Sequence, residues 1–184
     1  MISRNLKVIC VISFEDFVNI QNASIHPDWN LIESVLGFQI HNGLKNFYSK
    51  MRCDKPGCIQ GTYHLKASQF IQPSNNEFAS WIELISGDID YELYPLCTQE
   101  DDLSCIQEAF FKWTGGFNMG RRAMIGSFFT EVGNDFLLLF NNDTGAIEWN
   151  DPGFGYFEVY EQNPYGIFAN DIEEFYIKLS SGIA

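Results

Sequence analysis

The sequence predicts an α+β fold: a mixed, largely antiparallel sheet flanked by helices, with a helical hairpin near the N-terminus and a helix at the C-terminus. One observation is the unbroken apolar run at residues 136–140 (FLLLF), which is typical of a strand buried on both faces of a covered sheet. A second is the pair of Gly- and Asn-containing turns at residues 132–135 and 141–145, which separate this run from apolar runs on either side. A third is the helical spacing of apolar residues nearer both ends of the chain.

The N-terminal part predicts a helical hairpin over about residues 28–51. Trp29, Ile32 and Leu36 share one face of its first helix, and Gly37 stands where a helix usually ends. The second helix is expected at about residues 41–51, with an apolar stripe formed by Leu44, Phe47, Tyr48 and Met51. Ahead of the hairpin, residues 6–12 fit an edge strand and residues 13–18 fit a short helix, and neither pattern is decisive.

The middle of the chain, residues 53–122, predicts short strands and one helix. Residues 53–58 read as a turn, and strands are expected at residues 63–65 or 63–70, at 81–85 and at 91–94, with a turn at 86–88. Thr98 is the expected cap of a helix whose first turn is acidic, as the helix dipole favours. That helix continues at helical spacing through Leu103, Ile106, Phe110 and Trp113 and ends at Gly115 and Gly116.

The last part, residues 123–181, predicts three neighbouring strands, an irregular acidic loop and a closing helix. The three strands form the centre of the sheet, and the hairpin and the middle of the chain cover it. A length of 184 residues fits one domain with a proper core. Because no repeat, low-complexity tract or long linker divides the chain, residues 1–184 are predicted to form that single domain.

Acidic residues dominate the charge: 24 carboxylates face 11 basic side chains, a formal net charge of −13. The excess is strongest from Glu131 onward, where Lys178 is the only basic residue. Such a surface repels phosphates, so neither nucleic acid nor an anionic membrane is expected as a partner. A basic protein partner fits better, and solubility alone is the alternative explanation.

The cysteines and the N-terminus point to a reduced, cytoplasmic protein. Five cysteines are an odd number, no signal-peptide pattern opens the sequence, and no apolar run approaches the length that spans a bilayer. The cysteines are therefore expected to be small apolar fillers rather than disulfides.

The acidic loop at residues 148–161 is the candidate partner-binding segment, because it interleaves aromatic rings with carboxylates. Rings supply contact area, and carboxylates steer a basic partner and set its register. The expected contact residues are Glu148, Trp149, Asp151, Phe154, Tyr156, Glu158, Tyr160 and Glu161. The alternative is that Trp149, Phe154 and Phe157 belong to the core and that the acids merely face solvent.

Catalytic and metal-binding chemistry is weakly indicated. Cys53 and Cys58 bracket a Pro-Gly turn and could join His64, Cys97 and Cys105 around zinc, but their spacing is at the loose limit and no second close pair follows. A cysteine–histidine nucleophile has no marked candidate. The Gly-rich residues 115–122 lack the ending of a phosphate-binding loop. No catalytic residue, metal ligand or cofactor is predicted.

Two stretches, in this order, resemble the signature of the SUKH superfamily. Residues 31–40 (LIESVLGFQI) and 44–48 (LKNFY) are similar to a helix ending in E-x-x-L/I-G, a short x-L-P link and a helix ending in F-Y. Residues 133–149 and 169–175 are similar to the family's G-D-x-L/I-L-L-D, G-x-V-Y-x-W and A-x-S-F-E-E-F-L segments. Ile40 and His41 stand in place of Leu-Pro, Asn141 in place of the common Asp, and Asp171 and Ile172 in place of Ser-Phe.

The resemblance covers about half of the chain and leaves residues 53–130 unaligned. It implies a mixed sheet flanked by helices and a protein-binding scaffold without a general catalytic site. The family includes bacterial immunity proteins that neutralise toxins and fungal regulators of cell-wall synthesis. The expected function is therefore an immunity-type protein that occludes the surface of a cognate, basic toxin domain. The alternatives are a regulatory scaffold with a non-toxin partner and, less favoured, a Cys/His metal protein or enzyme.

Overall fold

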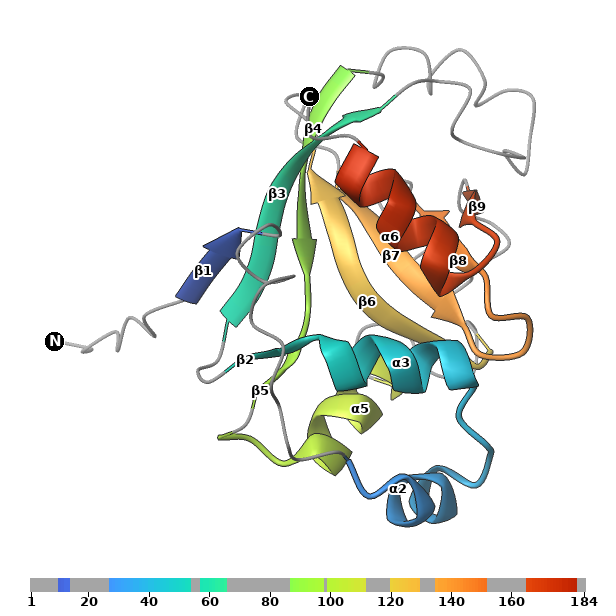
Figure 1. Ribbon diagram of the computed structural model, residues 1–184. Helices are drawn as coiled ribbons and strands as arrows, with labels where there is room; N and C mark the ends of the chain where they lie inside the picture. The colour runs from blue at the N-terminus through green and yellow to red at the C-terminus, as the bar shows by residue number, and fades with distance from the viewer. Residues whose placement is uncertain are drawn as a thin grey trace, which may run out of the picture.

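The computed structural model describes residues 10–13, 27–53, 57–65, 87–97, 99–111, 120–129, 135–151 and 165–181. Within these ranges it contains the helices α2 (Trp29–Leu36), α3 (Asn42–Lys50), α5 (Asp102–Phe111) and α6 (Ile172–Ser181) (Figure 1). The main sheet consists of β1 (Cys10–Ser13), β3 (Gly57–Leu65), β4 (Gly87–Leu93), β6 (Arg122–Phe129), β7 (Asp135–Asn141), β8 (Ile147–Asn150) and β9 (Tyr165–Ala169). A two-stranded sheet pairs β2 (Arg52–Cys53) with β5 (Leu96–Cys97).

The main sheet confirms the α+β prediction. Its strand order is β1-β3-β4-β6-β7-β8-β9, and every pair is antiparallel except β1 with β3. The predicted central strand is β7, which lies between β6 and β8. Residues 136–140 are buried throughout, with Phe136, Leu138 and Phe140 in the main core and Leu137 and Leu139 in a second cluster. The apolar run is therefore covered on both faces, as its composition indicated.

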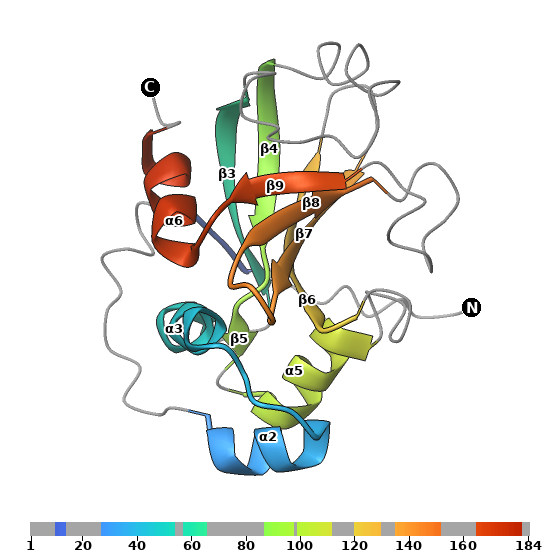
Figure 2. The ribbon, with the colours of Figure 1, turned by 90° about the vertical axis from the view of Figure 1, so that its right-hand side faces the viewer.

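Helices cover one face of the sheet, and this face holds the main core. Figure 2 shows α3 and α6 on the same side of the strands, with α2 and α5 below them. The core cluster draws side chains from all four described helices, and its rings meet edge to face. Phe168 of β9 lies 5.1 Å from Phe128 of β6 and 5.9 Å from Phe175 of α6, between ring centroids. Such edge-to-face pairs add to the stabilisation that burial supplies.

The helical hairpin is confirmed nearly to the residue. The Asp28 carboxylate accepts from the Leu31 amide at 3.1 Å, and Gly37 ends α2 with a left-handed φ of 78°. His41 caps α3, because its Nδ1 accepts from the Gly43 amide at 3.0 Å. The predicted stripe of α3 is buried in full, and α2 packs against α5 while α3 packs against α6.

The third helix starts later than predicted. Helix α5 begins at Asp102, because the Asp101 carboxylate accepts from the Ser104 amide at 3.0 Å and so caps the first turn. The acidic run contains several residues able to cap a helix, and the sequence does not say which one takes the position. At the other end of the chain, the closing helix is confirmed, with the Asp171 carboxylate accepting from the Glu174 amide at 2.8 Å.

Three predictions about strands need correction. Of the turn predicted at residues 53–58, Cys53 belongs to β2, and Gly57 and Cys58 belong to β3. Strand β9 pairs with β8, whereas the sequence predicted only an irregular loop before the closing helix. The strand was missed because its five residues, one of which is Gly166, are too few to show a clear alternation. Gly87 and Asp88 belong to β4 rather than to a turn. Three other predictions lie outside the described residues. They are the strand at 81–85, the short helix at about 13–18, of which only Ser13 is described, and the helix end at Gly115 and Gly116. No helix in the described ranges has the length and apolar character to cross a bilayer.

Candidate functional site

The structure buries three of the eight predicted contact residues. Glu148 is 7% exposed, Trp149 0% and Asp151 1%, so these side chains cannot form the surface contact that the sequence predicted. The other five, Phe154, Tyr156, Glu158, Tyr160 and Glu161, lie outside the described residues, and their contact role stays a prediction.

Trp149 belongs to the core, as the alternative interpretation held, but that interpretation was wrong to place the acids in solvent, because Glu148 and Asp151 are buried as well. In β8 Trp149 stands opposite Leu138 of β7 and Gly166 of β9, which places its side chain on the helix-covered face. Its ring meets Phe136 edge on, with centroids 5.8 Å apart and planes at 80°. Strand alternation then sends its neighbour Glu148 to the opposite face.

Glu148 is neutralised within the protein. Its carboxylate accepts from Arg122 Nε at 2.6 Å and from Asn141 Nδ2 at 2.6 Å. The other end of the Asn141 amide accepts from the backbone amides of Asp143 and Thr144, at 3.0 and 3.2 Å. This carboxylate therefore stabilises the β7–β8 turn and is not available to steer a partner.

The link between α2 and α3 is fastened to the same turn. Asn142 accepts from the His41 amide and donates to the Gln39 carbonyl, both at 2.8 Å. Gly145 has a φ of 82°, and a Cβ there would lie 2.6 Å from the His41 ring, so this position requires glycine. We call this contact the junction. It joins the α2–α3 link to the β7–β8 turn.

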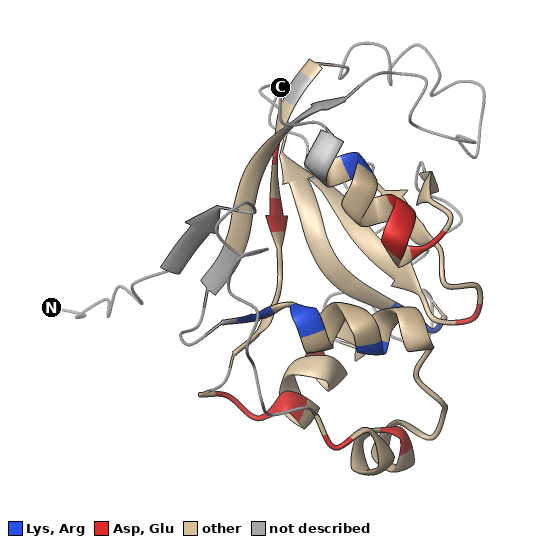
Figure 3. Cartoon of the chain, viewed as in Figure 1, with Lys and Arg blue, Asp and Glu red and all other residues tan. Residues whose placement is uncertain are grey.

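An open acidic surface lies instead on β3 and β4. Gln60, Thr62, Asp90, Glu92 and Phe129 line a hollow of about 430 Å³, which we call the acidic hollow. Thr62 Oγ1 donates to Asp90 at 2.9 Å, and the Gln60 amide donates to Glu92. Figure 3 shows acidic residues along β4, while basic residues colour α3.

Strand alternation explains why these acids are accessible. Ile89, Tyr91 and Leu93 of β4 are buried in the core cluster, so the intervening Asp90 and Glu92 face away from the helices. Thr62 and Asp90 are exposed, and Glu92 is partly exposed. The sequence predicted a strand here but not a site. The pattern that could have indicated it is the regular alternation of acidic and apolar residues from 88 to 93.

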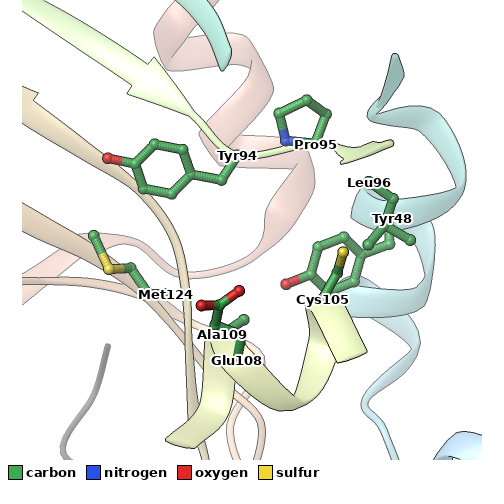
Figure 4. Close-up of a pocket in the computed structure, with 8 residues that line it drawn as sticks. All are labelled: Tyr48, Tyr94, Pro95, Leu96, Cys105, Glu108, Ala109 and Met124. Carbon is green, nitrogen blue, oxygen red and sulfur yellow. The ribbon is translucent and has the colours of Figure 1, made fainter. Parts of the chain in front are cut away.

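A second cavity of about 220 Å³ lies where α5 meets β5 and β6, and we call it the α5 cavity (Figure 4). It is lined by Tyr48, Tyr94, Pro95, Leu96, Cys105, Glu108, Ala109 and Met124. Burial, together with nearby carboxylates of which Glu100 acts most, raises the pKa of the Cys105 thiol to about 12. The thiol is therefore protonated at neutral pH, and a protonated thiol is a poor nucleophile.

Metal ligation finds no support in the part of the chain that the structure describes. There, no three His, Cys, Asp or Glu side chains come together in a way that would hold an ion. Cys97 and Cys105 are free thiols.

The described residues thus define an α+β protein whose one sheet face is packed by helices and whose other face carries an acidic hollow. Comparisons with protein families, with curated proteins and with solved structures found no match for this chain.

Proposed function

We propose that this chain is a non-catalytic, cytoplasmic protein-binding domain of the immunity type, which holds a basic toxin domain against the acidic hollow and occludes its surface. The observation that carries the proposal is the acidic hollow itself, where Asp90 and Glu92 lie side by side on an accessible sheet face. Glu148, Trp149 and Asp151 have no part in the proposed contact, because they are buried.

The hollow combines charge with fixed geometry. Thr62 and Gln60 each donate to one carboxylate, so Asp90 and Glu92 are held in place before a partner arrives. Ordering of this kind lowers the entropy cost of binding. Phe129 adds apolar contact area beside the charges. A partner rich in lysine and arginine is the complement of this surface, and the formal net charge of −13 adds long-range attraction.

The family part of the proposal rests on the resemblance of residues 31–40 and 44–48, and of residues 133–139, 144–149 and 169–175, to segments of the SUKH superfamily. The elements at these positions, α2, α3, β7, β8 and α6, are compatible with the helices and the sheet that the resemblance implies. The free thiols of Cys97 and Cys105 fit a reducing, cytoplasmic setting.

A regulatory scaffold of the same fold, with a non-toxin partner, would use the same surface. The genes that flank this one distinguish the two candidates, since an immunity gene is expected beside a toxin gene. A thiol enzyme is less favoured, because burial and nearby carboxylates keep the proton on the Cys105 thiol at neutral pH, and a protonated thiol is a poor nucleophile.

The test is to mix the purified chain with basic toxin domains encoded beside it and to measure association rates at rising salt. Binding is expected to slow as salt rises, and the Asp90→Asn, Glu92→Gln double variant is expected to slow association about tenfold at low salt. The matched control is Glu173→Gln, which neutralises an exposed acid on α6 away from the hollow. An association rate that changes neither with salt nor in the double variant would refute this surface as the contact.

A further inference from the structure

The wall of the α5 cavity contains a buried hydroxyl that the described residues leave without a hydrogen bond. Tyr48 of α3 is 2% exposed, and its ring meets Phe47 edge to face with centroids 5.3 Å apart. Its hydroxyl makes no hydrogen bond to any residue that the structure describes, and Figure 4 shows it directed into the cavity. Because a buried donor gains most from an acceptor placed beside it, an acceptor held in the cavity complements this hydroxyl.

The hydroxyl of Tyr48 is a neutral donor at neutral pH. Burial raises the pKa of Tyr48 above its ordinary value, and the nearby Cys105 thiol raises it further, so the hydroxyl keeps its proton. The Cys105 thiol is itself protonated and donates to a Glu100 carboxylate oxygen at 3.6 Å. Glu108 already has an interaction of its own within the chain. The group that a ligand meets in this wall is therefore the Tyr48 hydroxyl.

Negative charge beside the cavity disfavours an anionic ligand. Beyond burial, three carboxylates raise the pKa of the Cys105 thiol, so their field reaches the cavity wall. They belong to Glu100, Asp102 and Glu108. Among the described residues that line the cavity, none is basic. An anion would therefore leave water without a cation to offset its charge, whereas a neutral acceptor such as a carbonyl oxygen avoids that cost.

The volume of the α5 cavity, about 220 Å³, limits the ligand to one ring with a small substituent. An apolar cavity of about 150 Å³ holds benzene, so this cavity has room for a ring and a carbonyl group. Leu96, Ala109 and Met124 supply apolar walls. The rings of Tyr48 and Tyr94 add flat surfaces on which another ring packs well. Apolar walls with few polar groups that fix the orientation are typical of small-molecule sites.

We propose that the α5 cavity binds a small neutral compound that carries one ring and one carbonyl group. The carbonyl oxygen accepts from the Tyr48 hydroxyl, and the ring packs against Leu96, Ala109 and Met124. This site needs no protein partner, so it is independent of the proposed function.

The test titrates acetophenone into the isotopically labelled full chain while backbone amide shifts are followed. Ethylbenzene is the probe of similar shape without an acceptor, and benzoate is the anionic probe. Saturable shifts are expected for acetophenone at the amides of Leu96, Cys105 and Ala109. Ethylbenzene is expected to bind about fivefold more weakly, the usual value of one neutral hydrogen bond, and benzoate is expected to cause no saturable shifts.

The variant Tyr48→Phe removes the hydroxyl and keeps the ring. It is expected to weaken acetophenone binding about fivefold and to leave ethylbenzene binding unchanged. Its urea midpoint is expected to equal or exceed that of the wild type, because no hydrogen bond to a described residue is lost. The matched control is Tyr176→Phe, which removes another buried hydroxyl without a partner, on α6 and outside the cavity lining. This control is expected to bind acetophenone as the wild type does.

Several results would overturn the site. One is the absence of saturable acetophenone shifts in the wild type. Another is equal binding of acetophenone and ethylbenzene, or wild-type acetophenone binding by Tyr48→Phe, since the hydroxyl would then not hold the ligand. A lower urea midpoint in Tyr48→Phe than in the wild type would show that the hydroxyl already has a partner. None of these results bears on toxin binding, so the proposed function keeps its own test.

Discussion

Glu148 and Glu92 lie on the same face of the same sheet and have opposite environments. Glu148 of β8 is 7% exposed and accepts hydrogen bonds from Arg122 and Asn141. Glu92 of β4 is partly exposed, and the bond that the structure gives it comes from the neutral amide of Gln60. Arg122 therefore balances the charge of Glu148 inside the fold, whereas Glu92 presents its carboxylate at the surface.

The number of acids in a segment does not locate an acidic surface. A carboxylate contributes to an acidic surface only when no basic side chain of the same protein pairs with it, and this depends on which strands lie next to each other. Arg122 reaches Glu148 because Arg122 stands opposite Asn141 across the β6–β7 ladder, and Asn141 also bonds the same carboxylate. Among the described residues, none that lines the hollow around Asp90 and Glu92 is basic.

Substitution of Trp149 is expected to change stability most, because the sequence predicted this residue as a surface contact and the structure buries it in the core. Trp149→Ala is expected to lower the free energy of unfolding by about 3–5 kcal/mol, because it opens a large cavity in the main core. Phe111→Ala is the control, since Phe111 is 48% exposed on α5. Urea denaturation followed by circular dichroism measures both. A cost for Trp149→Ala no greater than that of Phe111→Ala would contradict the core assignment.

Two adjacent arginines, Arg121 and Arg122, test whether the pairing of Glu148 stabilises the fold. Arg122→Met removes the cation from a carboxylate that is mostly buried, and we expect a loss of about 2–3 kcal/mol. Arg121→Met removes a cation that pairs with Asp143 at 3.0 Å, where both side chains are 53% exposed. Solvent screens that pair, so its loss is expected to cost less than about 1 kcal/mol.

Denaturant midpoints of the two arginine variants, measured side by side, decide this prediction. Salt provides a second measurement: added salt is expected to shrink the small cost at Arg121 and to leave the larger cost at Arg122 nearly unchanged. Equal costs at both positions would mean that the Glu148 network does not stabilise the β7–β8 turn.

The sequence predicted most of the fold because its strongest patterns are local. The stripe of α3, the helix end at Gly37 and the apolar run of β7 are each set by residues within one element. The start of α5 and strand β9 were missed, since several acids compete for one cap and five residues are too few to show a period.

The candidate site was harder to predict, because it depends on pairing between distant strands. Strand alternation alone leaves the solvent side of β8 undetermined, and the β8–β9 pairing is what buries Trp149 towards the helices. The alternation in β4 was visible in the sequence, but the hollow also needs Gln60 and Thr62 of β3, which lie about 30 residues upstream and meet β4 only in the folded sheet. Burial of a carboxylate is a tertiary property, so Glu148 and Glu92 look alike until the strands are paired.

The smallest expected effect tests a third carboxylate, Glu33 of α2, which resembles Glu148 in being buried and compensated. A hydrogen bond from Lys45 holds the pKa of Glu33 below its ordinary value, opposed by burial and helped by the Ile40 amide, which donates to it at 2.9 Å. Because the folded pKa is the lower one, the carboxylate stabilises the fold above the unfolded pKa, about 4.3, and this contribution is lost as the pH falls through the folded value. Urea midpoints between about pH 6 and about pH 2.5 are therefore expected to fall less steeply in Glu33→Gln than in the wild type. Ser34→Ala, an exposed neighbour without a titrating group, is the control and is expected to keep the wild-type slope. A Glu33→Gln slope as steep as that of Ser34→Ala would show that this buried acid is not compensated in the way that Glu148 is.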